Sequence, residues 1–307
     1  MRAAVVTEPG APEALVVRDV PDPVPGEGET LIEVRAAGVN FADALIRRGA
    51  YPQMPPLPFV PGSEVAGVAP DGRRVLGFVR ERGGGYAERV AVSDAWLFDL
   101  PEGASFEEGA AFPMAFLTAW LPLTHQATVR PGQRVLVTAA AGGVGSAAVQ
   151  AARALGATVI AACGSEEKLA LPRSLGATEA VTYDRLSEVE PVDVILDPVG
   201  GASFVDALRL LRPLGTLIAI GFAGGPWPAL DPAVLVGRNV SVAGFYLGRL
   251  VQRQPELVAQ AMGDLLRLWE HGLLRPVVGA TFPLDRACDA HAALESRTST
   301  GKLVLVP

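Results

Sequence analysis

Residues 134–168 read "RVLVTAAAGGVGSAAVQAARALGATVIAACGSEEK". The stretch starts as an apolar strand, turns at a run of glycines, continues as an alanine-rich helix and ends as a second apolar strand. A glycine turn between a strand and a helix directs several backbone N–H groups and the positive end of the helix dipole at one point, which suits a pyrophosphate. The pattern therefore predicts a βαβ dinucleotide-binding unit.

The turn itself, "AAGGVG" at residues 140–145, departs from the usual fingerprint at one position. Ala140 stands where the first glycine is expected. Gly142 lets the backbone approach the phosphates, and Gly145 permits close packing of the helix against the strand. Because a strand precedes this turn and a helix follows it, cofactor binding is favoured over a turn that serves packing alone.

The acidic residue that usually follows the second strand is missing. In NAD-binding proteins an Asp or Glu at that point binds the ribose 2′-OH, whereas this chain has Cys163, Gly164 and Ser165. Small neutral residues leave room for a 2′-phosphate, and Lys168 in the next helix can neutralise it. The sequence therefore predicts NADPH, although a solvated surface lysine would give the same letters.

The chain has two different sequence patterns, which indicate two kinds of domain. The first hundred residues hold short β-branched runs separated by Pro and Gly, which predicts a β-barrel-like domain. From about Pro113, helical segments alternate with six buried strands, as in a doubly wound parallel sheet of the α/β class. A helix, a strand, a second helix and a final strand follow, and we expect them to return to the first domain. The predicted segments are 1–117, 118–248 and 249–307.

Composition excludes several classes of protein. A net charge of −7 disfavours a surface that tracks nucleic-acid phosphates. Two cysteines, Cys163 and Cys288, are too few for a disulfide framework and fit a reducing cytoplasm. The N-terminal residues are neither a signal peptide nor an anchor in pattern. The uncharged stretch 135–152 is interrupted by glycines and polar residues, so no membrane span is expected.

Taken together, these motifs resemble the zinc-independent quinone oxidoreductase family (zeta-crystallin-like) of the medium-chain dehydrogenase/reductase superfamily. The resemblance covers essentially the whole chain. It is carried by "AAGVNFADALIRRGAYP", "PGSEVAGV", "GGYAERVAV", "AAFPMAFLTAW", "AAAGGVGSAAVQ", "LGATEAVTYD", "ILDPVGG" and "HAALESRTSTGKLVLVP". It implies a GroES-like β-barrel catalytic domain beside a Rossmann-type six-stranded sheet, NADPH as cofactor, and a homodimer joined through the sheet edges. The apolar last strand, "VSVAGFYL", would otherwise leave an exposed edge.

The resemblance also implies the site residues, grouped by the part of the cofactor they face. The nicotinamide side takes Asn40, Thr118, Ile220 and Gly221; the pyrophosphate takes Gly143 and Val144 with Gly142 and Gly145; and the adenosine phosphate end takes Gly164, Ser165, Lys168, Tyr183 and Arg297.

No metal site is expected. Zinc-containing alcohol dehydrogenases of the same superfamily carry Cys and His where this chain has Asn40 and Ser63, and a cysteine-rich loop that is absent near "RERGGGYAERV" at residues 80–90. The three histidines lie singly outside those motifs and are expected to be ordinary surface or helix residues: His125, His271 and His291.

The implied reaction is direct hydride transfer from NADPH to a quinone without metal. A quinone spreads the arriving charge onto its oxygens, so positioning and a hydrogen bond suffice. Asn40 and Tyr51 form the predicted catalytic set. Tyr51 is the candidate donor to the substrate oxygen, with a structural aromatic as the alternative. Neither Cys163 nor Cys288 is expected to act as a nucleophile.

The substrate stays open at this point. Many family members have Tyr where this chain has Leu45, and "FAGGPW" at residues 222–227 is bulkier than usual, which indicates an apolar substrate pocket. Reduction of activated C=C bonds in enones or enoyl thioesters uses the same hydride geometry. A non-catalytic NADPH-binding protein is the third alternative.

Overall fold

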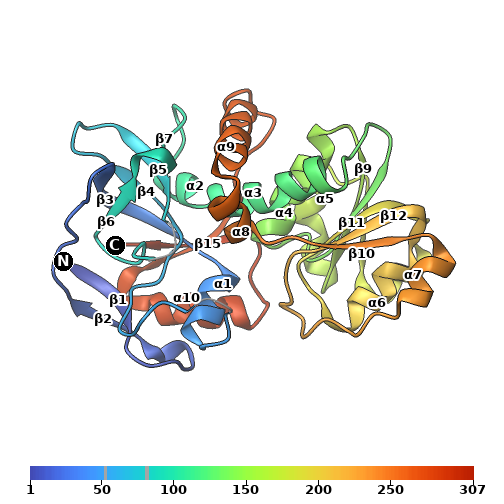
Figure 1. Cartoon of the computed structure of the whole chain (residues 1–307), viewed down its shortest axis with the longest axis horizontal. Coiled ribbons are helices and arrows are strands. Elements are labelled where there is room, and N and C mark those ends of the chain that lie inside the picture. Colours follow the sequence, from blue (N-terminus) through green and yellow to red (C-terminus); the bar gives the residue numbers. More distant parts are fainter. Residues whose placement is uncertain (52–53, 80–82) are drawn as a thin grey trace. The chain divides into compact units, whose positions relative to one another are not determined.

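The computed structural model describes residues 1–51, 54–79 and 83–307, which form two compact units (Figure 1). The first unit holds residues 1–114 and 275–307, and the second holds residues 115–274. The predicted order of segments is therefore found, but the return to the first unit begins at 275, not at 249. The difference arises because α9 (Pro255–Glu270) packs against α8 (Leu247–Arg253) inside the second unit.

The second unit is built on a six-stranded sheet in the order β10-β9-β8-β11-β12-β13, and every neighbouring pair is parallel. The strands are β8 (Arg134–Val137), β9 (Thr158–Cys163), β10 (Glu179–Thr182), β11 (Val192–Asp197), β12 (Leu211–Ala219) and β13 (Ser241–Gly244). This confirms the doubly wound sheet. The strand order reverses between β8 and β11, the position where open α/β sheets bind ligands.

Helices connect these strands and cover the sheet (Figure 1). The connecting helices are α4 (Gly143–Ala154), α5 (Ala170–Ser174), α6 (Gly201–Arg209) and α7 (Pro232–Arg238), and α3 (Pro113–Leu121) precedes β8. Central strands read as unbroken apolar runs because parallel strands are buried on both faces. Leu136, Ile160, Ile195 and Leu217 accordingly have no exposed surface.

The first unit is built on a seven-stranded sheet in the order β14-β15-β3-β4-β5-β7, with β6 also paired to β3. All pairs are antiparallel except β14 with β15. The strands are β3 (Glu29–Val39), β4 (Glu64–Val68), β5 (Arg74–Phe78), β6 (Arg89–Ser93), β7 (Leu97–Asp99), β14 (Val278–Pro283) and β15 (Lys302–Val306). A separate hairpin pairs β1 (Arg2–Val6) with β2 (Leu15–Asp19).

Residues from the two sequence segments of the first unit meet in its core. β15 lies between β14 and β3, with Leu303 opposite Val39 and Leu305 opposite Ala37. The helix α10 (Ala287–Glu295) contacts α1 (Phe41–Arg47) and the 3₁₀ turn Pro12–Ala14. The expected return of the chain to the first domain is therefore present. α2 (Phe106–Ala110) starts at a Ser105–Glu108 capping box and packs on β3 and β4.

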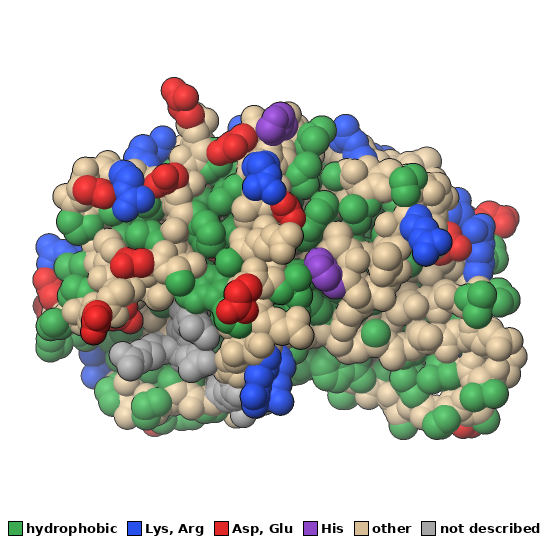
Figure 2. Space-filling model, turned by 45° about the horizontal axis from the view of Figure 1, so that its top comes forward, with side chains coloured by type: hydrophobic (Ala, Val, Ile, Leu, Met, Phe, Trp, Pro, Cys, Tyr) green, Lys and Arg blue, Asp and Glu red, His purple; other side chains and the backbone are tan. Residues whose placement is uncertain are grey.

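Acidic and basic side chains are interspersed on the face drawn in Figure 2, with no stripe of one sign. Among the described residues, many charged side chains form ion pairs, such as Arg185 with Glu188 and Arg73 with Asp71. Within the part of the chain that the structure describes, no helix has the length and apolar character needed to cross a membrane.

Candidate active site

The glycine turn follows β8 and opens α4, as predicted. Gly142 caps the helix and brings no side chain, so the first backbone N–H groups of α4 have neither an intrahelical acceptor nor a side-chain cap. The N–H groups of Gly143 and Val144 are thus placed to bind an anion. A Cβ at Gly145 would lie 2.0 Å from the carbonyl oxygen of Ala139, so only glycine fits there.

Tyr183, which follows β10, stabilises this turn through a hydrogen bond. It opens the 3₁₀ segment Tyr183–Glu188 after β10, and its hydroxyl oxygen accepts the backbone N–H of Ala139 at 2.8 Å. Ala139 has a left-handed φ of +46°, which costs free energy in a residue with a Cβ. The hydrogen bond from Ala139 to Tyr183 helps to hold that conformation. Sequence reasoning placed Tyr183 near the cofactor but gave no sign of this contact.

At the predicted adenosine phosphate end, the residues after β9 include a position with open space and a lysine. A Cβ at Gly164 would meet nothing within 4 Å. Ser165 precedes the 3₁₀ turn Glu166–Leu169, which carries the half-buried Lys168. A hydrogen bond from Ser165 holds the pKa of the exposed Glu167 below its usual range. Sequence reasoning missed Glu167, a carboxylate that competes for a predicted phosphate ligand.

Cys163 ends β9 with 1% of its surface exposed. Burial raises the pKa of its thiol, so little thiolate forms near neutral pH. This environment is that of a structural cysteine.

A buried carboxylate ties three strand ends of the second unit together. Asp197, at the end of β11, accepts hydrogen bonds from the Thr138 hydroxyl at 2.5 Å and from the Gly200 N–H at 2.8 Å. Its own carbonyl accepts the N–H of Ile220 at 2.9 Å. Burial raises the pKa of Asp197, and these donors oppose that rise. The stretch "ILDPVGG" contains this residue, but no sequence pattern singles it out.

The predicted nicotinamide residues of the second unit lie at these ends and on α3. Ile220, Gly221 and Thr118 are half-buried. A Cβ at Gly221 would lie 2.9 Å from the Pro198 carbonyl oxygen, so the strand end packs tightly. Just beyond it, the rings of Phe222 and Trp227 form an edge-to-face pair with centroids 4.9 Å apart.

In the first unit, Asn40 is the centre of a buried polar cluster. It caps α1 after β3 and has 8% of its surface exposed. Its side-chain oxygen accepts from the Lys302 ammonium at 2.5 Å, and its side-chain nitrogen donates to Glu64 Oε1 at 3.0 Å. Lys302 and Glu64 also form an ion pair at 2.6 Å. The second oxygen of Glu64 accepts the N–H of Met114 at 2.8 Å.

Gly38 makes room for this cluster. A Cβ at that position would lie 2.4 Å from Glu64 Oε1 and 2.3 Å from the carbonyl oxygen of Ala110. Strand β3 therefore needs glycine shortly before Asn40, because any side chain would displace the carboxylate.

Asp43 holds the backbone of Asn40 and the hydroxyl of Ser63. Its carboxylate accepts the N–H of Asn40 at 2.9 Å, the Ser63 hydroxyl at 3.1 Å and the Tyr86 hydroxyl at 3.0 Å. Burial raises the pKa of Asp43, and these hydrogen bonds oppose that rise. For Tyr86, burial and the Asp43 carboxylate raise the pKa well above its usual value, so the phenol stays protonated.

His291 continues the network. Arg47 has only donors, so its contact of 3.4 Å with His291 Nδ1 leaves the ring proton on Nε2, which donates to Tyr86 at 3.2 Å. Burial, with a smaller effect of Arg47, lowers the pKa of His291 to about 3. His291 lies on the helix α10, as one of the two expectations had it, but it is fully buried and not a surface residue. Lone histidines give no sequence signal for such a role.

The side chains around Asn40 do not fit a metal ion. Among residues 1–51, 54–79 and 83–307, no group of three or more His, Cys, Asp or Glu could hold one. The amide of Asn40 is engaged by Glu64 and Lys302, and the hydroxyl of Ser63 by Asp43. An ammonium 2.5 Å from Asn40 Oδ1 would repel a second cation.

The two remaining predicted residues lie in the first unit. Tyr51 is half-buried shortly after α1, and Arg297 is exposed after α10 with a left-handed φ of +58°. Residues 52–53 and 80–82, which include the end of "GAYP" and the start of "RERGGGYAERV", lie outside the described residues. The predicted site residues thus divide between the units: Asn40, Tyr51 and Arg297 in the first, all others in the second.

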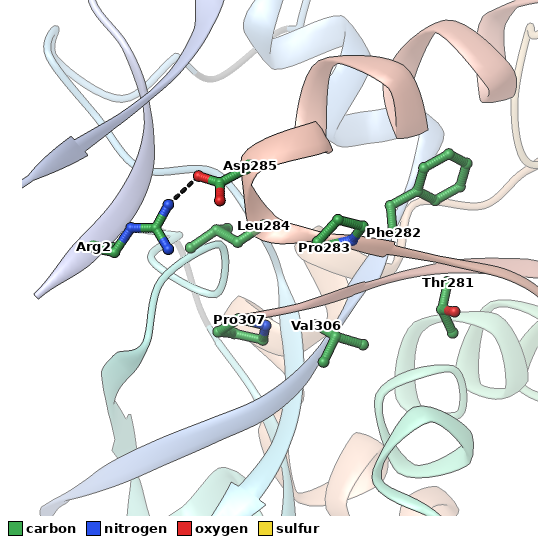
Figure 3. Close-up of a pocket in the computed structure, with 8 residues that line it drawn as sticks. All are labelled: Arg2, Thr281, Phe282, Pro283, Leu284, Asp285, Val306 and Pro307. Atoms are coloured by element: carbon green, nitrogen blue, oxygen red, sulfur yellow. Dashed lines mark hydrogen bonds and ion pairs between the residues drawn. The ribbon is translucent and has the colours of Figure 1, made fainter.

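A groove of about 410 Å³ lies on the first unit beside β14 and β15 (Figure 3). It contains none of the predicted site residues. Its charged members, Arg2 and Asp285, are about half exposed and form an ion pair with each other. The remaining lining side chains are apolar apart from Thr281, and nothing there points to chemistry.

Comparison with known proteins gives matches over the whole chain. The family model of the alcohol dehydrogenase GroES-like domain matches residues 26–102, and that of zinc-binding dehydrogenase matches residues 143–263. Quinone oxidoreductase-like protein 2 of Rattus norvegicus is 37% identical over 99% of this chain and 91% of that protein. Quinone oxidoreductase of Mus musculus is 34% identical over 100% of this chain and 98% of that protein.

Solved structures agree. The quinone oxidoreductase from Thermus thermophilus, determined also in complex with NADPH, is 46% identical, with a TM-score of 0.90 over 100% of both chains. The expected pairing of a GroES-like unit with a Rossmann-type unit is confirmed by these matches.

Proposed function

Because the chain belongs to the zinc-independent, quinone oxidoreductase-like family of the medium-chain dehydrogenase/reductase superfamily, we propose that this oxidoreductase transfers a hydride from NADPH to a quinone. The observation that carries the proposal is the Lys302 ammonium bound to Asn40. A cation of the protein lies where a metal-assisted reaction would need a ligand, so the reaction favours an acceptor that spreads the arriving charge over its own atoms and needs only hydrogen bonds from the protein. Quinones do this by conjugation.

The cofactor fits the second unit in two respects. The N–H groups of Gly143 and Val144 at the start of α4 suit a pyrophosphate. The open space at Gly164 beside Lys168 suits a 2′-phosphate, with Ser165, Tyr183 and Arg297 as further ligands. When bound, NADPH supplies the hydride. We assign Asn40, Thr118, Ile220 and Gly221 to the nicotinamide side.

Tyr51 is our candidate donor to the substrate oxygen. A Tyr51→Phe variant separates its two possible roles, since a residue that only positions substrate raises KM and spares kcat. A donor that stabilises charge lowers kcat and kcat/KM together. An unchanged variant would remove Tyr51 from the reaction. No covalent intermediate is proposed, because burial raises the pKa of both thiols, Cys163 and Cys288.

The test is oxidation of NADPH by the purified protein in the presence of quinones, enones or enoyl thioesters. The proposal expects turnover with quinones, no stoichiometric zinc by elemental analysis, and full activity in a chelator. Turnover with enones or enoyl thioesters alone would make the protein a reductase of activated C=C bonds. NADPH binding without turnover of any acceptor would make it a binding protein. One zinc per chain with activity lost on chelation would overturn the mechanism.

We also propose that the protein is a homodimer joined through β13. This strand ends the sheet of the second unit, and unpaired strand edges attract other chains. Large apolar side chains are exposed on the elements beside it, including Leu214 at 89% and Val236 at 76%. Light scattering at micromolar concentration should give twice the chain mass. The two free cysteines fit a cytoplasmic location, which we propose as well.

A further inference from the structure

The side-chain amide of Asn40 can be assigned atom by atom. The oxygen and nitrogen of an asparagine are usually distinguished only by their partners. Here the partners are unambiguous, because an ammonium can only donate and a carboxylate can only accept. Lys302 therefore faces Oδ1 and Glu64 faces Nδ2. Turning the amide over would set two donors against each other and two acceptors against each other.

Burial makes this assignment strict. Asn40, Lys302 and Glu64 are 8%, 5% and 0% exposed, so water has little access to replace a lost partner. The backbone of Asn40 is fixed as well, by its N–H bond to Asp43. Both the backbone and the side chain of this residue thus have one orientation.

The contacts with Glu64 and Lys302 do not use all the hydrogen-bonding capacity of the Asn40 amide. It has two N–H protons and two lone pairs, and Glu64 and Lys302 use one of each. The ion pair at 2.6 Å also neutralises the charge of Glu64, so the remaining proton is not flanked by an unpaired negative charge. Such a proton suits an oxygen that becomes negative during a reaction.

We propose that Lys302 and Glu64 are positioning residues that hold the Asn40 amide in one orientation, so that its remaining Nδ2 proton donates to the acceptor oxygen on which charge develops. The inference rests on the proposed hydride transfer. Asn40 would touch the substrate, whereas Lys302 and Glu64 act only through Asn40. The three come from distant parts of the chain, with Lys302 262 residues and Glu64 24 residues away from Asn40.

The kinetic test uses the double variant Glu64→Gln/Lys302→Met, which removes both charges together and leaves no lone charge buried. We expect it to bind NADPH within about twofold of the wild type and to lose about tenfold in kcat and in kcat/KM alike, since an oriented donor acts in the transition state. Asn40→Ala should lose about a hundredfold. Lys302→Arg keeps the charge and the donor, and should retain most of the activity.

A double-mutant cycle distinguishes positioning from packing. If Lys302 and Glu64 act through Asn40, the double substitution should cost almost nothing further in kcat once Asn40 is alanine. Losses that multiply in the triple variant would overturn the proposal. Thermal unfolding shows whether each variant is folded. For a variant that is not folded, the NMR measurement described below takes the place of the kinetic test.

The amide itself can be observed without turnover. The chain has only two asparagines, Asn40 and the exposed Asn239, so selective ¹⁵N-asparagine labelling yields the signals of two side-chain amide groups, a pair of protons for each. Asn40 should exchange its amide protons at least about tenfold more slowly than Asn239, since its amide is buried and bonded. The double variant should lose most of that protection. Equal exchange for Asn40 and Asn239 would overturn the orientation even if quinones are reduced. A protected Asn40 in a protein without turnover would instead overturn the proposed function and leave the orientation intact.

Discussion

The two halves of the predicted site are built by opposite means. In the second unit, the turn at residues 140–145 works by lacking side chains: Gly145 has no room for a Cβ, and helix α4 offers backbone N–H groups. In the first unit, the cluster around Asn40 works mainly through charged and polar side chains, with an ion pair and a second carboxylate that are nearly free of solvent.

This difference decides what each half tolerates. Substitutions other than proline leave the backbone N–H groups in place, so the turn depends on small residues and local geometry. Buried charges are favourable only in pairs, so the Asn40 cluster fails when one partner is removed. We therefore expect stability to depend on the first unit's cluster and cofactor affinity to depend on the second unit's phosphate end.

The largest effect is expected for Lys302→Met. It leaves Glu64 buried without a counter-charge, and loss of one partner from such a pair costs about 3–5 kcal/mol in the free energy of unfolding. Urea unfolding measures this. The matched double variant Glu64→Gln/Lys302→Met should recover most of the loss, and a single variant as stable as the wild type would break the comparison.

The same substitution at Lys168 should change cofactor affinity and leave stability nearly unchanged. Lys168→Met should weaken NADPH about ten- to a hundredfold, because a charge-assisted contact to a phosphate is lost, and should leave NADH binding and stability nearly unchanged. Fluorescence titration with both cofactors checks this. Equal losses for NADPH and NADH would show that Lys168 serves folding.

Glu167 provides a control at the predicted phosphate end, because its substitution should strengthen NADPH binding where that of Lys168 weakens it. Glu167→Gln removes the carboxylate that holds Ser165 and repels a phosphate, so NADPH should bind about two- to threefold more tightly. High salt should reduce the gain.

Acid should weaken the first unit through His291. The pKa of His291 in the folded protein is about 3, below its ordinary value. Between these two pKa values the unfolded chain is protonated at His291 and the folded chain is not. Stability is therefore lost as the pH falls below about 6.5, by about 2 kcal/mol between pH 6.5 and 5. His291→Gln keeps the shape of the two hydrogen bonds but has no titrating ring. The difference between variant and wild type across this pH range isolates His291 from Asp43, and parallel pH profiles would contradict the assignment.

Arg297→Gly is expected to change stability and NADPH affinity in opposite directions. Arg297 has a left-handed φ of +58°, which suits glycine, so the variant should gain about 1 kcal/mol in stability. Loss of the cation should nevertheless weaken NADPH about tenfold. Arg297→Ala separates the two effects, since it loses the cation and keeps the strain. Unchanged NADPH affinity in both variants would exclude Arg297 from the phosphate end.

These contrasts explain what could be read from the sequence. The turn at residues 140–145 was predictable because its determinants are contiguous and small. The six strands were predictable because each is a buried apolar run. The cluster was not, since Lys302 and His291 reach Asn40 and Tyr86 only through the pairing of β15 with β3 and the packing of α10. Glu167 was overlooked because its hydrogen bond to Ser165 depends on a local turn. The return boundary was misplaced because an amphipathic helix does not reveal which unit it covers.

The interleaving of the first unit sets an order for its biosynthesis. Residues 115–274 are synthesised as one uninterrupted segment, so the second unit can fold while translation continues. The first unit must wait, because β15 inserts between β14 and β3 and brings Lys302 to Asn40. Until then, Glu64 and Asn40 have no ammonium partner, and the sheet edge at β3 is open to other chains. A ribosome stalled before residue 302 therefore holds a protein with a complete second unit and an unfinished first unit.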